Sequence, residues 1–165
     1  MDGTGSEGGG AVRRGGIFDR SRWPDIGLLL LRLGFGLGFI YFHGWSKLVA
    51  GPEGWTRTGS AVEHLGIGFG HTFFGFMAAF AEAIGGLLFA IGFLFRPAAI
   101  LVVITMFVAW FMHVSTGRGT PAHAFKNLWV ALGLAFIGPG RYSVDAWLAG
   151  RRGQPEIELP TEPGR

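Results

Sequence analysis

The sequence predicts an all-α integral membrane protein: a bundle of four membrane-spanning helices with both termini on the inner side. Hydrophobic residues make up 49% of the 165-residue chain and charged residues only 15%. A soluble domain of this size could not keep so much apolar surface from water. The apolar residues also gather in runs long enough to cross a bilayer, and the run at 73–95 holds a single charge, Glu82. Together these features predict one membrane domain.

Composition divides the chain into three segments. Residues 1–22 are rich in glycine and charge without apolar periodicity, which predicts a disordered cytoplasmic tail. Residues 23–148 form the predicted four-helix membrane domain. Residues 149–165 are polar and are predicted to form a second disordered cytoplasmic tail.

The spans are expected at about residues 26–48, 72–95, 97–114 and 122–137. Trp23-Pro24-Asp25 is typical of a helix that begins at a membrane interface. Arg96-Pro97 predicts a tight turn between the second and third spans, with the proline in the first turn of the next helix. The fourth segment is the shortest, so its length fits either a full span or a buried, re-entrant helix.

Lysine and arginine are distributed unevenly between the two sides of this arrangement. Nine lie on the side of the termini: Arg13, Arg14, Arg20, Arg22, Arg96, Arg141, Arg151, Arg152 and Arg165. Four lie on the other side: Lys47, Arg57, Arg118 and Lys126. Because positively charged loops stay inside, both termini are predicted inside.

Polar and small residues share one face of each of the first two spans. At about 100° per residue, one side of the first helix carries Arg32, Gly36, His43 and Lys47, and one side of the second carries His71, Gly75, Ala78, Glu82 and Gly86. The small residues on these faces, together with Gly34 and Gly38 at four-residue spacing, are expected to allow close helix contact. An unpaired carboxylate at the bilayer centre costs about 2.5–3.5 kcal/mol. Arg32 is therefore predicted to form a buried ion pair with Glu82, which either fixes helix register or handles protons.

Histidines and lysines concentrate in the outer half of the bundle. His43, His71 and His113 are expected at similar depths and, with Lys47 and Lys126, to line an outward-facing pocket. The histidines either form hydrogen bonds at the outer interface, donate to the carbonyls of a quinone headgroup, or provide two axial ligands to haem b. A histidine zinc site is a further alternative, weakened by the lack of a nearby carboxylate ligand.

The sequence also excludes several function classes. It has no cysteine, so thiol redox chemistry, disulfides and thiolate metal sites are excluded, and a redox role would need a bound cofactor or a partner. The net charge of +3 comes without a basic helix or an aromatic–basic module, so nucleic-acid binding is not expected. No metal site and no covalently bound cofactor are predicted.

Three motifs resemble the DoxX family of small four-span membrane proteins: HGWSKL at 43–48, AEAIGGLLFAIGFLFRPAA at 81–99 and GPGRYSVDAWL at 138–148. The resemblance covers about residues 26–148. The residues that match the family pattern are Arg32, His43, Gly44, Lys47, Glu82, Gly85, Gly86, Arg96 and Arg141. The resemblance implies a four-helix membrane bundle. It also implies association with membrane redox systems, since the family takes its name from a subunit linked to thiosulfate:quinone oxidoreduction.

The expected function is that of a small subunit of a membrane oxidoreductase system, multi-pass in a bacterial-type inner (plasma) membrane and dependent on protein partners. A quinone or a similar lipid-soluble ligand would occupy the outward-facing pocket. Glu82, restrained by Arg32, would help to move a proton, but the chain is not expected to be catalytic alone. The alternative is a non-enzymatic membrane anchor or assembly subunit, in which the charged pair only specifies packing.

Overall fold

The computed structural model describes residues 22–152, and every regular element in this range is a helix. In chain order the elements are α1 (Trp23–Phe39), the π-helical turn η2 (Ile40–Gly44), α2 (Trp45–Leu48), α3 (Gly51–Gly59), the 3-10 helix η3 (Ser60–Leu65), α4 (His71–Ile91), α5 (Phe95–Thr116), α6 (Pro121–Ile137) and α7 (Val144–Arg152). Both predicted tails lie largely outside the described residues. The second was predicted to begin too early, because residues 149–152 belong to α7.

Three helices are long and apolar enough to cross a membrane: the continuous helix Trp23–Leu48, which comprises α1, η2 and α2, together with α4 and α5. This confirms the all-α class and gives a candidate membrane helix at each of the first three predicted spans. α6 has 17 residues and is therefore about 25 Å long, somewhat shorter than a hydrocarbon core of about 30 Å. The fourth crossing stays a prediction.

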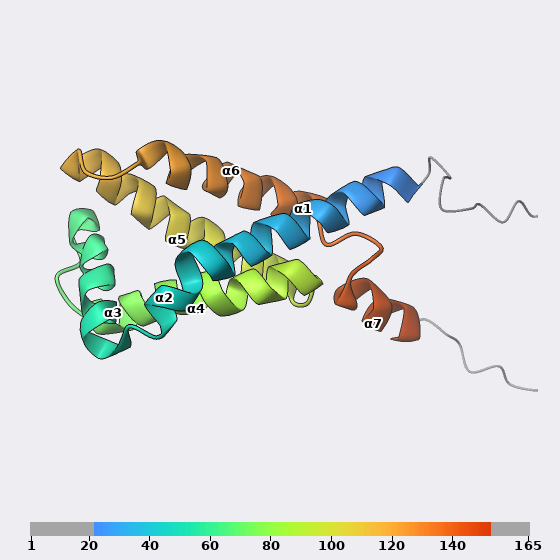
Figure 1. The fold of residues 1–165 in the computed structure, drawn as a ribbon, viewed down its shortest axis with the longest axis horizontal. Coiled ribbons are helices and arrows are strands. Elements are labelled where there is room, and N and C mark those ends of the chain that lie inside the picture. Colours follow the sequence, from blue (N-terminus) through green and yellow to red (C-terminus); the bar gives the residue numbers. More distant parts are fainter. Residues whose placement is uncertain (1–21, 153–165) are drawn as a thin grey trace, which may run out of the picture.

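The long helices α1, α4, α5 and α6 alternate in direction, and both ends of the described chain lie at the same end of the bundle (Figure 1). α4 packs against α1 on one side and α5 on the other, and α5 packs against α6. α3 and η3 lie across the opposite end, over the start of α4. We call this the outer end, and the end with the chain termini the inner end.

Glycines bring α1 and α4 into close contact. A Cβ atom on Gly36 would lie 2.4 Å from the carbonyl oxygen of Gly86, and one on Gly44 would lie 2.5 Å from the nitrogen of Ala83. Only glycine fits at such approaches. The predicted contact through Gly36 and Gly86 is confirmed. The contact predicted for Gly34 and Gly38 is wrong, since a Cβ atom on either would have no neighbour within 4 Å.

Large side chains separate α1 from α5 and α6. Phe39 packs in a buried cluster with Val102 of α5 and Leu128 of α6, and Phe35 packs against that cluster and against the one that holds Phe95 and Leu134. α1 is therefore close to α4 through glycines and is held away from α6 by aromatic rings, which leaves room at the outer end for polar groups.

The glycine contacts also define the axial offset between α1 and α4. Gly44 lies beside Glu82 and Ala83, whereas Arg32 lies beside Gly92. Glu82 is thus ten residues along α4, or about 15 Å, from the level of Arg32. The prediction that the Arg32 side chain reaches Glu82 is therefore wrong. The start of α4 extends past the end of α2 and is covered by α3, where the backbones of Trp55 and Gly75 are in close contact.

The turn between α4 and α5 lies at residues 92–94, slightly before the predicted one, with Pro97 in the first turn of α5 as expected. The carboxylate of Asp145, from α7, accepts hydrogen bonds from the backbone N–H groups of Leu94 and Phe95, at 3.0 Å each. These N–H groups have no partner within α5 because they lie at its start. Asp145 therefore caps α5 and fixes α7 against the inner end.

Candidate functional site

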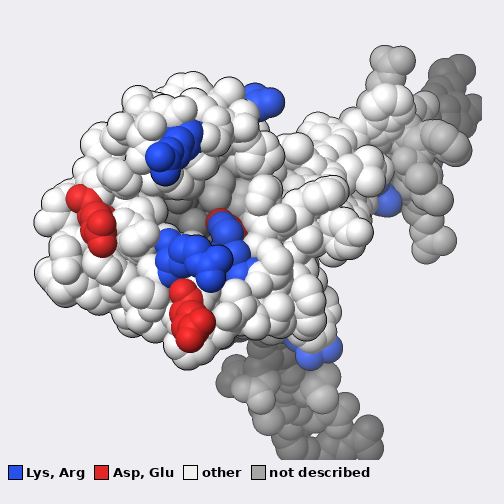
Figure 2. Space-filling view, turned by 60° about the vertical axis from the view of Figure 1, so that its left-hand side comes forward, with Lys and Arg blue, Asp and Glu red and all other residues white. Residues whose placement is uncertain are grey.

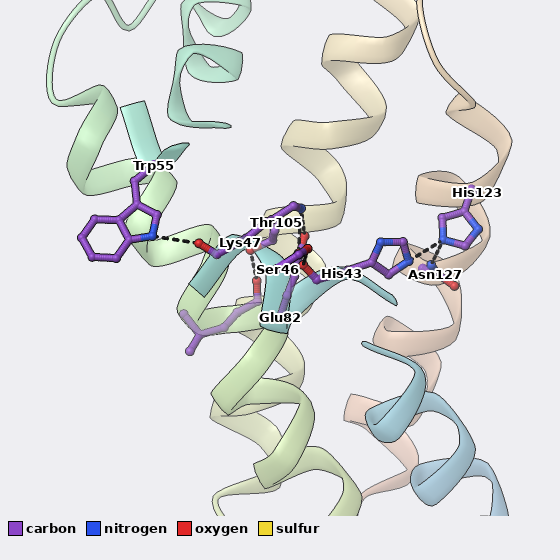
Figure 3. Close-up of polar contacts among 9 residues, drawn as sticks. His43, Ser46, Lys47, Trp55, Glu82, Thr105, His123 and Asn127 are labelled. Carbon is purple, nitrogen blue, oxygen red and sulfur yellow. Dashed lines mark hydrogen bonds and ion pairs between the residues drawn. The ribbon is translucent and has the colours of Figure 1, made fainter. Parts of the chain in front are cut away.

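The acidic side chain in the middle of α4 pairs with a lysine from the outer end of the first helix. Lys47 Nζ lies 2.7 Å from Oε1 of Glu82 and 2.7 Å from Oε2. The Glu82 side chain is 1% exposed and that of Lys47 is 34% exposed. The partly exposed Lys47 side chain therefore neutralises the buried Glu82 carboxylate (Figure 3).

The predicted Arg32–Glu82 ion pair is wrong. Arg32 is buried, but its guanidinium donates to the backbone carbonyl oxygens of Pro139 and Tyr142 at the inner end. The offset between α1 and α4 explains why Lys47, and not Arg32, is the partner of Glu82. Glu82 lies level with Gly44, and Lys47 follows Gly44 by about one turn.

The π-helical turn η2 lies at the same level as Glu82. Its wide turn is closed by a hydrogen bond from the Trp45 N–H to the Ile40 carbonyl oxygen, five residues back. π-Helical turns are rare in proteins, and those that occur are often found at functional sites. Here the turn places Gly44 against α4 and directs the imidazole of His43 towards α6.

His43 makes the polar contact between the first helix and α6. His43 Nε2 lies 3.0 Å from Nε2 of His123, and the Asn127 amide nitrogen lies 3.1 Å from the same atom of His123 (Figure 3). When the Asn127 amide and His43 Nε2–H both donate to His123 Nε2, they share its single lone pair in a three-centre contact. His43 Nδ1 is then left as an acceptor.

Beside this contact is a cavity of about 450 Å³, which we call the polar pocket. Its lining residues come from the first helix, α4, α5, α6 and the turn before α6: His43, Lys47, Glu82, Met106, Ala109, His113, Thr120, His123 and Ala124. His113 Nδ1 lies 2.8 Å from the Arg118 carbonyl oxygen. Since a carbonyl only accepts, Nδ1 is the donor, and Nε2 of neutral His113 is an acceptor.

A second and larger cavity, of about 720 Å³, lies between α4 and α5 beneath α3 and η3; we call it the apolar cavity. α4 and α5 are in contact near Gly85 and Val102. Towards the outer end they separate, and η3 packs against both helices there, with Val62 buried. The wall is largely apolar, with Phe73, Phe74, Met77, Leu101, Ile104, Val108 and Met112 among its members.

The two cavities adjoin at the ion pair, because Lys47, Glu82, Ala109 and His113 line both. Basic side chains, Arg57 and Arg118, also line the apolar cavity. Figure 2 shows the outer end as a hollow with lysine and arginine at its mouth and an acidic group inside. The site is therefore a cleft with a polar part and an apolar part, joined at one buried carboxylate.

Of the five residues predicted to line an outer pocket, His43, Lys47 and His113 come together. His71 does not, since its Nε2 lies 3.3 Å from a Glu63 carboxylate oxygen, and it lines neither cavity. Lys126 is exposed and also lines neither cavity.

His123 is the residue of the polar pocket that the prediction omitted. A signal was present in the sequence, because His123 and Asn127 are four residues apart and so share one face of a helix. The adjacent Ala124 and Leu128 are buried against α5.

Among residues 22–152, no three His, Cys, Asp or Glu side chains lie close enough together to hold a metal ion. His43 and His113, considered from the sequence as axial haem ligands, are directed at His123 and at the Arg118 carbonyl oxygen. This geometry suits hydrogen bonding to a small ligand better than axial ligation of a porphyrin.

Comparison with protein-family models matches residues 27–114 to the DoxX family. The matched range includes His43, Lys47, Glu82 and His113 and ends before α6, so it does not include His123. Comparison with curated proteins and with solved structures gives no match.

Proposed function

Because the chain belongs to the DoxX family of membrane proteins, we propose that it is a small subunit of a membrane oxidoreductase system that binds a quinone or a similar lipid-soluble carbonyl compound. The single observation that carries the proposal is the position of the Lys47–Glu82 pair, at the junction of the polar pocket and the apolar cavity. A molecule with a polar ring and an apolar chain matches a cleft divided in this way.

The polar pocket offers both kinds of hydrogen-bonding group that such a compound needs. Lys47 Nζ is a donor for a carbonyl oxygen, while Glu82 and His113 Nε2 are acceptors for a hydroxyl group. Lys47 can therefore donate to a carbonyl oxygen of the oxidised quinone. Glu82 and His113 can accept from a hydroxyl group of the reduced form.

Quinone reduction consumes two electrons and two protons, and the electrons would come from a protein partner. On the chain, Glu82 is placed to exchange a proton with a group bound against Lys47. His43 and His123 extend the polar contacts from the pocket towards the exposed side of α6. In this proposal Arg32 plays no part in proton transfer, because it lies at the other end of α1.

We also propose that α6 crosses the membrane as a fourth span and that both chain ends lie inside, in a bacterial-type inner membrane. The alternating helix directions place both ends of the described chain on one side (Figure 1). The excess of lysine and arginine on that side supports the orientation.

The test is mass spectrometry of small molecules extracted from protein purified in mild detergent. The variants are a Lys47→Met, Glu82→Met double variant, which removes the charged pair as a unit, and a Lys126→Met control. Wild type and control are expected to carry close to one lipid-soluble carbonyl compound per chain, and the double variant less than a tenth of that. Equal retention in all three proteins would contradict the proposed site.

The same samples test the alternative of a non-enzymatic anchor or assembly subunit. That function predicts no retained small molecule in wild type, together with partner proteins whose recovery does not depend on Lys47 and Glu82. Retained ligand that is lost in the double variant and kept in Lys126→Met would exclude a purely architectural role for the pair.

A further inference from the structure

A shallow groove of about 400 Å³ lies at the inner end, far from the cleft. Its walls come from the end of α4, the turn at 140–143 and the start of α7: Ile91, Arg141, Tyr142, Ser143, Val144 and Trp147. We call it the inner groove. None of its residues lines the polar pocket or the apolar cavity.

Buried polar contacts hold the turn that forms this groove. The Arg32 guanidinium donates to the carbonyl oxygens of Pro139 and Tyr142. Ser143 Oγ donates to the Gly140 carbonyl oxygen at 2.7 Å and accepts from the Ala146 N–H at 3.1 Å, which caps α7. Buried hydrogen bonds thus hold the backbone of the turn at 140–143, while the Arg141 side chain is exposed.

The two carboxylates near the inner groove are bound to backbone N–H groups, whereas the two arginines beside it have no acidic partner among residues 22–152. Asp25 accepts the backbone N–H of Arg141, at 3.1 Å, and Asp145 caps α5, so both carboxylates are bound to backbone N–H groups. The Arg151 guanidinium carbon lies 3.7 Å from the centre of the Trp147 ring, which forms one wall. Neither Arg141 nor Arg151 forms an ion pair with an acidic side chain of residues 22–152.

An apolar strip leads from the groove along the outside of the bundle. Leu87 and Ile91 are four residues apart on α4, so they share one face, and they are 45% and 42% exposed. Trp147, at the groove itself, is 55% exposed. Tryptophan beside arginine at the end of a membrane helix is typical of the headgroup region of a bilayer.

We propose that the inner groove binds an anionic phospholipid. The phosphate group is held by the guanidinium groups of Arg141 and Arg151, which suit phosphate oxygens in geometry and charge. The glycerol backbone lies against Trp147, and an acyl chain follows Ile91 and Leu87 into the membrane. This site is independent of the ligand proposed for the outer cleft.

The test measures binding of phosphatidylglycerol and phosphatidylcholine to the full chain in neutral detergent by native mass spectrometry. Each arginine near a surface phosphate contributes a free energy equivalent to about a fivefold change in affinity. We therefore expect about fivefold weaker phosphatidylglycerol binding in Arg141→Gln or Arg151→Gln, and about 25-fold in the double variant. The charge-matched control for each single variant is Lys126→Gln at the outer end, which lines neither cavity and should bind phosphatidylglycerol like wild type.

Three results would overturn the proposal. The first is equal binding of phosphatidylglycerol and phosphatidylcholine, and the second is an equal loss in the control, which would indicate a net-charge effect. The third is equally strong competition by deacylated glycerophosphoglycerol, which would assign the groove to free phosphate esters. Thermal unfolding in lipid-free detergent should not differ between Arg141→Gln and wild type, because the Arg141 side chain is exposed.

Discussion

Lys47 Nζ contacts both carboxylate oxygens of Glu82 at 2.7 Å, and this contact joins the outer end of the first helix to the middle of α4. Glu82 is nearly inaccessible to solvent and Lys47 is one-third exposed. The pair is therefore a buried acid neutralised from the solvent side. The same two side chains line both the polar pocket and the apolar cavity.

Replacing Lys47 alone should destabilise the protein. Lys47→Met leaves the Glu82 carboxylate buried without a cation, at an expected cost of about 2 kcal/mol, below the value for a fully buried pair because Lys47 is partly exposed. The double variant Lys47→Met, Glu82→Met removes both charges and should recover most of this loss. Denaturant unfolding in a fixed detergent, followed by tryptophan fluorescence, gives the values. A double variant less stable than Lys47→Met would show that the carboxylate contributes through other contacts.

Two glycines of the first helix should respond in opposite ways to a methyl group. In Gly44→Ala the new Cβ would lie 2.5 Å from the backbone nitrogen of Ala83, so α1 and α4 must separate, at a cost of about 1–3 kcal/mol. In Gly38→Ala the methyl group meets no atom within 4 Å, and helix propensity favours alanine by up to about 1 kcal/mol. Melting temperatures of the two variants should fall on opposite sides of wild type. Equal melting temperatures would contradict the close contact at Gly44.

Helix class and approximate positions could be predicted because they depend on local properties. Apolar runs of about 20 residues predict membrane helices, and Trp23-Pro24-Asp25 marks a helix start at the residue where α1 begins. The pairing of α1 with α4 through a polar, small-residue face was also correct. Gly36 and Gly86 were correctly predicted to make the contact, whereas Gly34 and Gly38 were not. The contact of Gly44 with α4 was missed, because a π-helical turn changes the direction of residues after Ile40 and has no recognisable signal in a single sequence.

The site was predicted only in part, because ion pairing depends on the axial offset between helices. Depths were assigned from each helix separately, which put Glu82 within reach of the Arg32 side chain. The observed offset is defined by the glycine contacts between α1 and α4, which depend on tertiary packing and not on the depth of either helix alone. His43, Lys47 and His113 were identified because polar residues in a membrane helix face the bundle interior. His123 was left out because its importance depends on the partner across the bundle, His43.

Asp145 should stabilise the inner end as a helix cap. Its two carboxylate oxygens accept the N–H groups of Leu94 and Phe95 at 3.0 Å, so Asp145→Ala should cost about 1–2 kcal/mol. Asp145→Asn keeps one acceptor and should cost about half as much. Unfolding free energies of the three proteins should therefore form a graded series. Equal losses for alanine and asparagine would indicate that charge, rather than acceptor count, is the stabilising property.

Arg32 should stabilise the inner end without affecting the outer cleft. Arg32→Met removes the donors to the carbonyl oxygens of Pro139 and Tyr142, and we expect a loss of about 3 kcal/mol. The loosening should be local, with faster hydrogen exchange at Ala146 and Trp147, whose N–H groups bond to Ser143. Exchange at the Trp45 N–H, within the π-helical turn beside Glu82, should stay as in wild type.

The matched control for Arg32→Met is Arg96→Met, which removes an exposed arginine from the same end and should leave exchange unchanged throughout. The experiment also decides between the two partners considered for Glu82. If Arg32 were that partner, Arg32→Met would leave the buried Glu82 carboxylate without a cation. Hydrogen exchange would then become faster around Trp45 as much as around α7. Faster exchange confined to α7 is expected instead, because Arg32 and Glu82 lie about 15 Å apart along the helix axes.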